Sequence, residues 1–86
     1  MIEKLFAVKD DKGLTYIGKS FEQNGNSITF TQYVLVPTWI VDCLQGGRKS
    51  YEEIALDLWQ ERKESKLENQ TISSLKEDCI IPLPNF

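Results

Sequence analysis

The sequence predicts a single α+β domain: a three-stranded antiparallel β-meander packed by one short and one long C-terminal helix, with an extended C-terminal tail. Residues 2–36 form three short runs rich in strand-forming side chains between clusters of turn residues, and the third run, residues 27–36, alternates between two faces as antiparallel strands do. Residues 50–68 instead repeat apolar side chains at helical spacing. The chain has 86 residues, of which 41% are hydrophobic, and this suits one domain with one modest core.

Strands are expected at residues 2–8, 14–21 and 27–36. Gly13 can take the positive φ that closes a hairpin between the first two strands. Asn24-Gly25 predicts a second tight turn before the third strand. Gly18, inside the second strand, predicts a bulge or a close approach of another backbone.

The third strand is predicted to keep one apolar face along its whole length. The residues on that inner face are Ile28, Phe30, Val34 and Val36. Gln32 is a polar interruption of the inner face, and Tyr33 falls on the outer face. An aromatic side chain on an outer face is a candidate anchor for a protein partner.

Pro37 has no N–H for a sheet ladder, so the third strand should end there. Thr38 can then cap a short helix over residues 39–45, which Gly46-Gly47 would end. The alternative is a bent continuation of the strand, because Ile40 and its neighbour are β-branched. Trp39 is expected in the core, with an anchor for a partner as the alternative.

Residues 36–44, VPTWIVDCL, followed by a glycine, resemble the tryptophan-containing last helix of BRCT domains, which packs its tryptophan inside. The resemblance covers about a dozen residues. It stops there, because residues 1–36 read as a meander where that family has a βαββαβ segment. The Ser/Thr-Gly and Lys that bind phosphate in some BRCT domains also lack counterparts, so we assign no function from the resemblance.

The long helix is predicted from a capping box, in which Ser50 accepts from the N–H of Glu53 and the glutamate reaches back. Its apolar face holds Tyr51, Ile54, Ala55 and Leu58. Trp59 lies at the margin of this face, where it is either a core residue or a partner anchor.

Carboxylates follow a different face of the same helix and form the most distinctive pattern in the chain. They are Glu53, Asp57, Glu61, Glu64 and Glu68. Neighbours at i,i+4 carry like charges, which mildly destabilises a helix, whereas a helix selected only for stability would alternate Glu and Lys. We therefore interpret the acidic ridge as a docking surface for a basic partner. The alternative is a solvated helix face.

The C-terminal part, residues 69–86, is expected to be a linker and a tail. Residues 69–74 read as polar linker, and Ser74 with Glu77 could cap a stub of helix. From residue 79 the chain is apolar, and Pro82 and Pro84 exclude a helix or a central strand. The tail should lie extended on the core or along the sheet edge.

The residue types argue against catalysis. The chain has no histidine, so the commonest general base and zinc ligand are missing. Cys43 and Cys79 are expected to be free, buried thiols, with a disulfide between them as the alternative. There is no P-loop and no GxGxxG motif. We expect neither catalytic residues nor a cofactor nor a metal.

The charge distribution indicates the kind of partner. The net charge of −3 comes from residues 51–86, which hold eight acidic and four basic residues. An acidic half argues against direct nucleic-acid binding, because that affinity rests on cations. The only support for nucleic-acid binding is a set of scattered basic residues, Lys9, Lys12, Lys19, Arg48 and Lys49. No apolar run approaches the ~18 residues of a membrane span, and the N-terminus does not read as a signal peptide.

We therefore expect a small, cytoplasmic, non-enzymatic protein of a bacterium or phage that binds a basic protein and blocks or regulates it. Immunity proteins, antitoxins and phage-encoded inhibitors are of this type. The residues expected to bind the partner are Glu53, Asp57, Glu61, Glu64, Glu68, Trp59 and Tyr33. Two other classes stay open: a self-assembling accessory subunit, with a homodimer as its simplest form, and a small-ligand-binding domain or enzyme with a pocket between sheet and helix.

Overall fold

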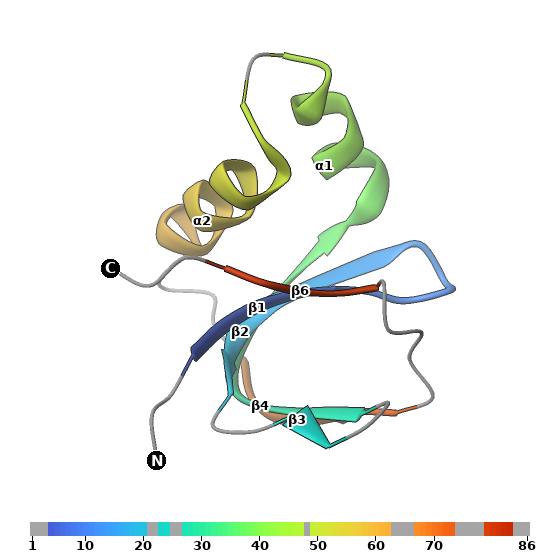
Figure 1. Ribbon diagram of the computed structural model, residues 1–86, viewed down its shortest axis with the longest axis vertical. Coiled ribbons are helices and arrows are strands. Elements are labelled where there is room, and N and C mark those ends of the chain that lie inside the picture. The colour runs from blue at the N-terminus through green and yellow to red at the C-terminus, as the bar shows by residue number, and fades with distance from the viewer. Residues whose placement is uncertain are drawn as a thin grey trace.

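The computed structural model describes residues 4–20, 23–24, 27–47, 49–62, 67–73 and 79–83. These residues form an α+β structure with an antiparallel sheet and two helices, α1 and α2 (Figure 1). The elements are β1 (Lys4–Lys9), β2 (Leu14–Ser20), β3 (Gln23–Asn24), β4 (Ser27–Pro37), α1 (Thr38–Gln45), α2 (Tyr51–Glu61), β5 (Leu67–Ile72) and β6 (Ile80–Pro82). No helix among them is both long and apolar enough to cross a bilayer.

The predicted meander is present as the centre of a larger sheet. β2 pairs with β1 on one side and with β4 on the other, both antiparallel. β6 adds to the free edge of β1, and β3 and β5 both pair with β4. The described residues therefore form six strands where three were expected. Asn24 pairs with Ser27, which confirms the second hairpin, while its turn residues 25–26 lie outside the described residues.

The predicted extent of the long helix is wrong. α2 ends at Glu61, and residues 67–72, expected as helix end and polar linker, form β5 against β4. Glu68 pairs with Gln32 there, and Thr71 pairs with Thr29. The edge of β4 offers backbone hydrogen-bond partners to this segment, whereas further helix would have stacked like charges with Leu67 as its only apolar residue.

The C-terminal tail lies along the sheet edge, which was one of its two predicted positions. β6 pairs antiparallel with β1, and the N–H of Leu83 donates to the carbonyl of Leu5 over 2.9 Å. Pro82 is tolerated because β6 lies at the edge of the described sheet, where one side of a strand needs no ladder partner. The predicted helix stub at 74–77 lies outside the described residues.

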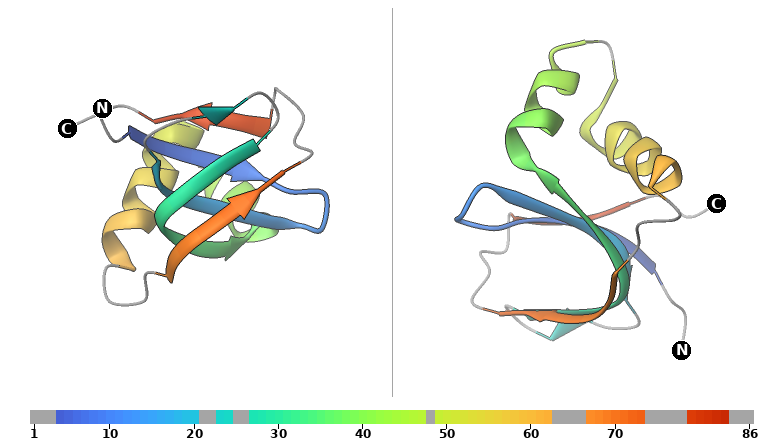
Figure 2. Two further views of the ribbon diagram at one scale, coloured as in Figure 1. Left: turned by 90° about the horizontal axis from the view of Figure 1, so that it is seen from below. Right: turned by 180° about the vertical axis from the view of Figure 1, so that it is seen from behind.

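The sheet coils so strongly that both of its faces are buried (Figures 1 and 2). We call the two clusters the helix-side core and the inner core. In the helix-side core the sheet contributes Ala7, Ile17, Val34 and Val36, and the helices contribute Val41, Tyr51, Ile54, Ala55, Leu56, Leu58 and Trp59. The inner core, enclosed by the sheet itself, consists of Phe6, Val8, Ile28, Phe30, Tyr33 and Ile80.

β4 passes from one core to the other, which the sequence analysis did not predict. Phe30 and Tyr33 are both in the inner core although they are three residues apart, whereas Val34 is in the helix-side core. The change of face occurs at Thr31, where the pairing with β5 is interrupted opposite Asn69. Asn69 has a φ of 55°, the left-handed conformation that asparagine tolerates better than most residues. The prediction of one continuous apolar face is therefore wrong.

Gly18 makes this bend possible. A Cβ built at Gly18 would lie 2.1 Å from the carbonyl oxygen of Gln32 and 2.7 Å from the Cα of Tyr33. The predicted close backbone approach is confirmed, and it falls beside the point where β4 changes face.

Both helix starts are defined by the chain before them. Residues 38–45 form a helix, not a strand, but its N-cap is Pro37 and no side chain caps it. Thr38 Oγ1 instead lies 2.9 Å from Thr15 Oγ1. For α2 the expected cap is confirmed: Ser50 Oγ accepts from the N–H of Glu53 over 3.3 Å. The hydroxyl of Ser50 also meets the Glu53 carboxylate at 3.5 Å.

Candidate functional site

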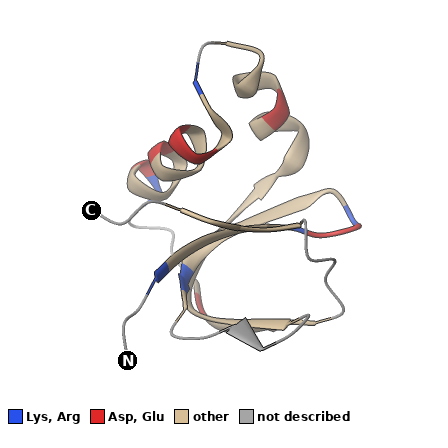
Figure 3. Ribbon diagram, in the orientation of Figure 1, with Lys and Arg blue, Asp and Glu red and all other residues tan. Residues whose placement is uncertain are grey.

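The acidic ridge survives on α2 in shortened form. Glu53, Asp57 and Glu61 lie at i,i+4 spacing on its outer side, and together they span roughly 12 Å at helical rise. Figure 3 shows that the acidic residues of the described chain lie mainly on α2 and at the β1–β2 turn, with others on α1 and β5. Glu68 is not part of the ridge, because it lies on β5, and Glu64 lies outside the described residues.

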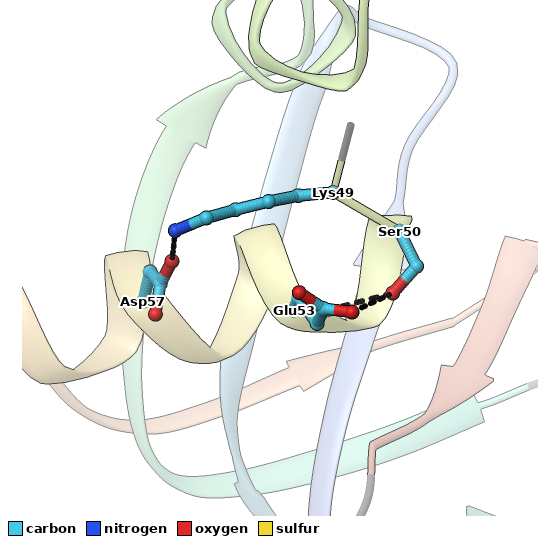
Figure 4. Close-up of polar contacts among 4 residues, drawn as sticks. All are labelled: Lys49, Ser50, Glu53 and Asp57. Carbon is cyan, nitrogen blue, oxygen red and sulfur yellow. Dashed lines mark hydrogen bonds and ion pairs between the residues drawn. The ribbon is translucent and has the colours of Figure 1, made fainter. Parts of the chain in front are cut away.

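A cation from outside the helix occupies the middle of the ridge. Lys49 Nζ lies 2.5 Å from Asp57 Oδ2, bridging from the residue before the N-cap to the second turn of α2 (Figure 4). This hydrogen bond raises the pKa of Lys49, with smaller contributions from Glu53 and Glu61. The central carboxylate is therefore partly neutralised, and the negative charge is strongest at the two ends of the ridge, Glu53 and Glu61.

An apolar groove runs beside the ridge, between α1 and α2. Its volume is about 210 Å³, several times the roughly 30 Å³ that one water occupies in the liquid. Leu44 of α1 and Ile54 and Leu58 of α2 provide its apolar lining. Lys49, Asp57 and Glu61 provide the rest of the lining. We call this the acidic groove. Leu44 is 49% exposed beside it, although leucine is a residue that usually packs inside.

The expected core position of Trp39 is wrong, whereas Trp59 takes the core position that was one of its two predicted places. Trp39 is 66% exposed on α1, whereas Trp59 is 6% exposed and belongs to the helix-side core. Lys19 Nζ lies 6.0 Å from the centre of the Trp59 ring. α1 faces the core with Val41, and Trp39 lies about 160° away from that residue at helical spacing. The exposure of Trp39 could therefore have been predicted from the sequence by the same helical spacing.

Tyr33 is also buried, so its predicted place on an outer face is wrong. It is 8% exposed, and its ring packs in the inner core against the rings of Tyr16 at 5.7 Å and Phe30 at 6.0 Å. Neither Tyr33 nor Trp59 presents its ring to a partner in this structure. The exposed apolar side chains near the ridge are Leu44 and, on the outer side of α1, Trp39.

Cys43 lies one turn after Trp39 and is exposed, which corrects the expectation that it is buried. Cys79 is half-buried, and both thiols are free, so the predicted alternative of a bridge between them is not realised. Among the described residues, cysteine and carboxylate side chains do not come together in groups of three that could hold a metal ion.

Tyr51 is a buried hydroxyl at the start of α2. Its ring lies 4.6 Å from Lys9 Nζ, and its oxygen has no hydrogen-bond partner among the described residues. Burial raises the pKa of Tyr51 to about 12, against a smaller opposing effect of the nearby Thr15 hydroxyl and with a small contribution from Asp42.

Alkaline pH should therefore destabilise the protein. In the unfolded chain Tyr51 ionises near its ordinary value of 10.0, and in the folded chain only near 12. The unfolded state then binds fewer protons between these values, so stability is complete below pH 10 and falls as pH rises to about 12, by roughly 2–3 kcal/mol in all. Denaturant unfolding measured from pH 8 to 12 checks this.

Tyr51→Phe provides the matched control for this loss of stability at alkaline pH. The substitution removes the titrating group and an unsatisfied buried hydroxyl. We therefore expect the free energy of unfolding to fall less between pH 10 and 12 and to be higher by about 1 kcal/mol at pH 7. A variant that keeps the full alkaline loss would assign that loss to other groups.

The arrangement as a whole offers apolar surface bordered by carboxylates, which is chemistry for docking a partner that carries both apolar and basic side chains. Comparison of the chain with known proteins finds no family model that matches it, no curated protein that matches it and no solved structure that matches it.

Proposed function

We propose that this chain is a small, non-enzymatic, cytoplasmic protein that binds a basic surface of another protein and blocks or regulates that protein. The observation that carries the proposal is the acidic groove, where exposed Leu44 lies beside the carboxylates of Asp57 and Glu61. Charge steers a basic partner to such a surface, and a central apolar contact then supplies most of the affinity.

The mode of binding follows from the shape of the groove. An apolar side chain of the partner would enter between Leu44 and Leu58, while flanking Lys or Arg side chains would meet Glu61 and Glu53. Asp57 would contribute less, because Lys49 already neutralises part of its charge. Trp39 is exposed on another side of α1, about 140° around the helix from Leu44, and would have a separate contact with the partner.

The test compares two variants with the same change in net charge. The groove variant carries Glu61→Lys and Glu53→Gln, since glutamine keeps the capping box intact. The control carries Asp11→Lys and Glu68→Gln, which lie at exposed positions on the β1–β2 turn and β5. Each immobilised protein is used to capture a partner from lysate of the cells that encode it, and affinity is then measured with the purified partner.

We expect the groove variant to bind at least about tenfold more weakly than the control, and high salt to release the wild-type complex. Leu44→Asp should weaken binding as well, through the apolar contact. Equal weakening by both charge variants would mean that net charge alone attracts the partner, and it would overturn the proposal. Unchanged binding of both would do the same.

Glu61→Lys should also separate function from stability. Glu61 is the last residue of α2, and the last turn holds no basic residue, so its carboxylate opposes the helix dipole. A lysine there should raise the free energy of unfolding by about 0.3–1 kcal/mol while weakening partner binding. Denaturant unfolding of the single variant measures the first effect. A loss of stability would contradict the placement of residue 61 at the end of the helix.

Self-assembly is a second candidate, favoured by the exposed Trp39 side chain and by the exposed residues of β5 at the edge of the described sheet. α1 and β5 lie at opposite ends of the molecule (Figures 1 and 2), so an isologous dimer would form through one surface or the other. Light scattering across a range of concentrations distinguishes the candidates. A dimer that Trp39→Ala dissociates supports self-assembly, and a monomer at all concentrations removes it.

A further inference from the structure

A second, larger cavity lies at the open side of the coiled sheet, away from the helices. Its volume is about 530 Å³, within the range of roughly 300–1,000 Å³ typical of small-molecule sites. It lies between the β1–β2 turn, the end of β5 and Cys79. The cavity exists because, in the described part of the chain, β5 pairs only with β4 and β6 only with β1, so the coiled sheet does not close into a barrel there.

The walls of this cavity combine one fixed aromatic ring with polar side chains. Tyr16 is half-buried, and its ring stacks on Phe30 at 6.4 Å and meets Tyr33 at 5.7 Å, so the inner core holds it in place. Gln70 of β5 contributes its amide on the opposite side, where its Nε2 donates to the Thr71 carbonyl at 3.4 Å and its carbonyl oxygen is an acceptor. The Thr71 hydroxyl faces the other way and lies 3.1 Å from Thr29 Oγ1. An amide both donates and accepts hydrogen bonds, as a hydroxyl does.

The charges at the cavity favour a ligand without negative charge. Lys9 contributes to the lining, but its ammonium points to the helix side of the sheet, 4.0 Å from Asp42 Oδ1 and 4.6 Å from the Tyr51 ring centre. The other charged groups with which the described residues line the cavity are the two carboxylates of Asp10 and Asp11 and the ammonium of Lys12. A phosphate or carboxylate ligand would therefore meet more repulsion than attraction.

The turn is built to hold its carboxylate in place. Asp10 Oδ1 accepts from the backbone N–H groups of Lys12 at 2.9 Å and Leu14 at 2.8 Å, which fixes the side chain before any ligand arrives. Burial, with a smaller contribution from Asp10, raises the pKa of Tyr16 above its ordinary value. The Tyr16 hydroxyl therefore stays protonated at neutral pH.

We propose that this cavity binds a small, neutral, hydroxyl-rich molecule of the size of a mono- or disaccharide. The carboxylates and the Gln70 amide would accept from its hydroxyl groups, and the Tyr16 ring would pack against its C–H face. The site is independent of the acidic groove, since the two share no lining residue.

The test uses three probes with related sugar rings: maltose, glucosamine and glucose 6-phosphate. Each is titrated into ¹⁵N-labelled protein, and the amide shifts are followed by NMR. We expect maltose to give saturable shifts at Leu14, Tyr16, Gln70 and Thr71 and none on α2, with glucose 6-phosphate binding more weakly than either other probe.

Variants then test the lining. Asp11→Asn and Gln70→Ala should each weaken maltose binding by about fivefold, the effect of losing one hydrogen bond, with the rest of the spectrum retained. Glu52→Gln on α2, which lines neither cavity, is the control and should leave maltose binding unchanged. Absence of saturable shifts with maltose, shifts that the variants leave unaltered, or tighter binding of glucose 6-phosphate would each overturn the proposal. None of these results bears on capture of a protein partner at the acidic groove.

Discussion

Gly18→Ala should destabilise the protein by at least about 3 kcal/mol, a large share of the stability of a domain of this size. The added Cβ would lie 2.1 Å from the Gln32 carbonyl oxygen, which belongs to the backbone of β4 and cannot turn aside like a flexible side chain. Relief requires β2 and β4 to separate where they pair, at Gly18 and Tyr33. Denaturant unfolding followed by circular dichroism measures the loss.

Gly13→Ala is the matched control. Gly13 has a φ of 83°, and a Cβ there would meet nothing within 4 Å. Its substitution should cost only the left-handed backbone penalty, about 1–2 kcal/mol. If Gly18→Ala proved no more costly than Gly13→Ala, the close approach of β2 and β4 would not be the reason for glycine at position 18.

The two tryptophans should differ widely in their effect on stability. Trp59→Ala removes a side chain that is 6% exposed from the helix-side core and should cost about 3–5 kcal/mol. Trp39→Ala removes a side chain that is 66% exposed and should change the free energy of unfolding by less than about 0.5 kcal/mol. Equilibrium unfolding of the two variants, measured side by side, gives both values.

Fluorescence gives an independent measurement for the same pair. The emission that remains in Trp59→Ala comes from the exposed Trp39 and should be red-shifted and readily quenched by a soluble quencher. The emission that remains in Trp39→Ala should be blue-shifted and protected. The reverse result would show that Trp39 is the core residue, as the sequence analysis had expected, and would remove it from the proposed binding surface.

The sequence was sufficient where a local rule decides the structure. Strand-forming residues between turn signals predicted β1 and β2, alternation predicted most of β4, and the Ser50–Glu53 cap predicted where α2 begins. Gly18 indicated a close backbone approach because a glycine inside a strand usually has such a reason. Each of these features depends on the residues of one segment and its immediate neighbours.

The sequence was insufficient where a distant segment decides. The residues of β5, LENQTI, are mostly exposed and show no alternation, and those just before them are good helix formers. Only the neighbouring edge of β4 makes them a strand. The change of face at Thr31 was not predicted either, because a pattern that repeats every two residues assumes that the strand keeps the same two faces along its length. The one sign of the change in the sequence was the polar residue Gln32 on a predicted apolar face.

These two errors account for the wrong placement of Glu68 and Tyr33 at the candidate site. Extending the helix to residue 68 lengthened the acidic ridge and added Glu68, which belongs to β5. Treating β4 as one regular strand placed Tyr33 outside. The ion pair between Lys49 and Asp57 had no signal in the i,i+4 pattern of the helix, because Lys49 precedes the N-cap.

The pairing of β6 with β1 has a consequence for the order of assembly. Phe6 faces Pro82 across this pair, so it joins segments near opposite ends of the described chain, whereas the hairpins β1–β2 and β3–β4 close over short turns. Strand pairs between distant segments form slowly, because bringing the segments together lowers the chain entropy before the stabilising contacts have formed. We therefore expect β6 to dock last, after both cores have begun to form. A strand of only three residues also detaches readily, and its departure would expose the hydrogen-bonding edge of β1 to other chains.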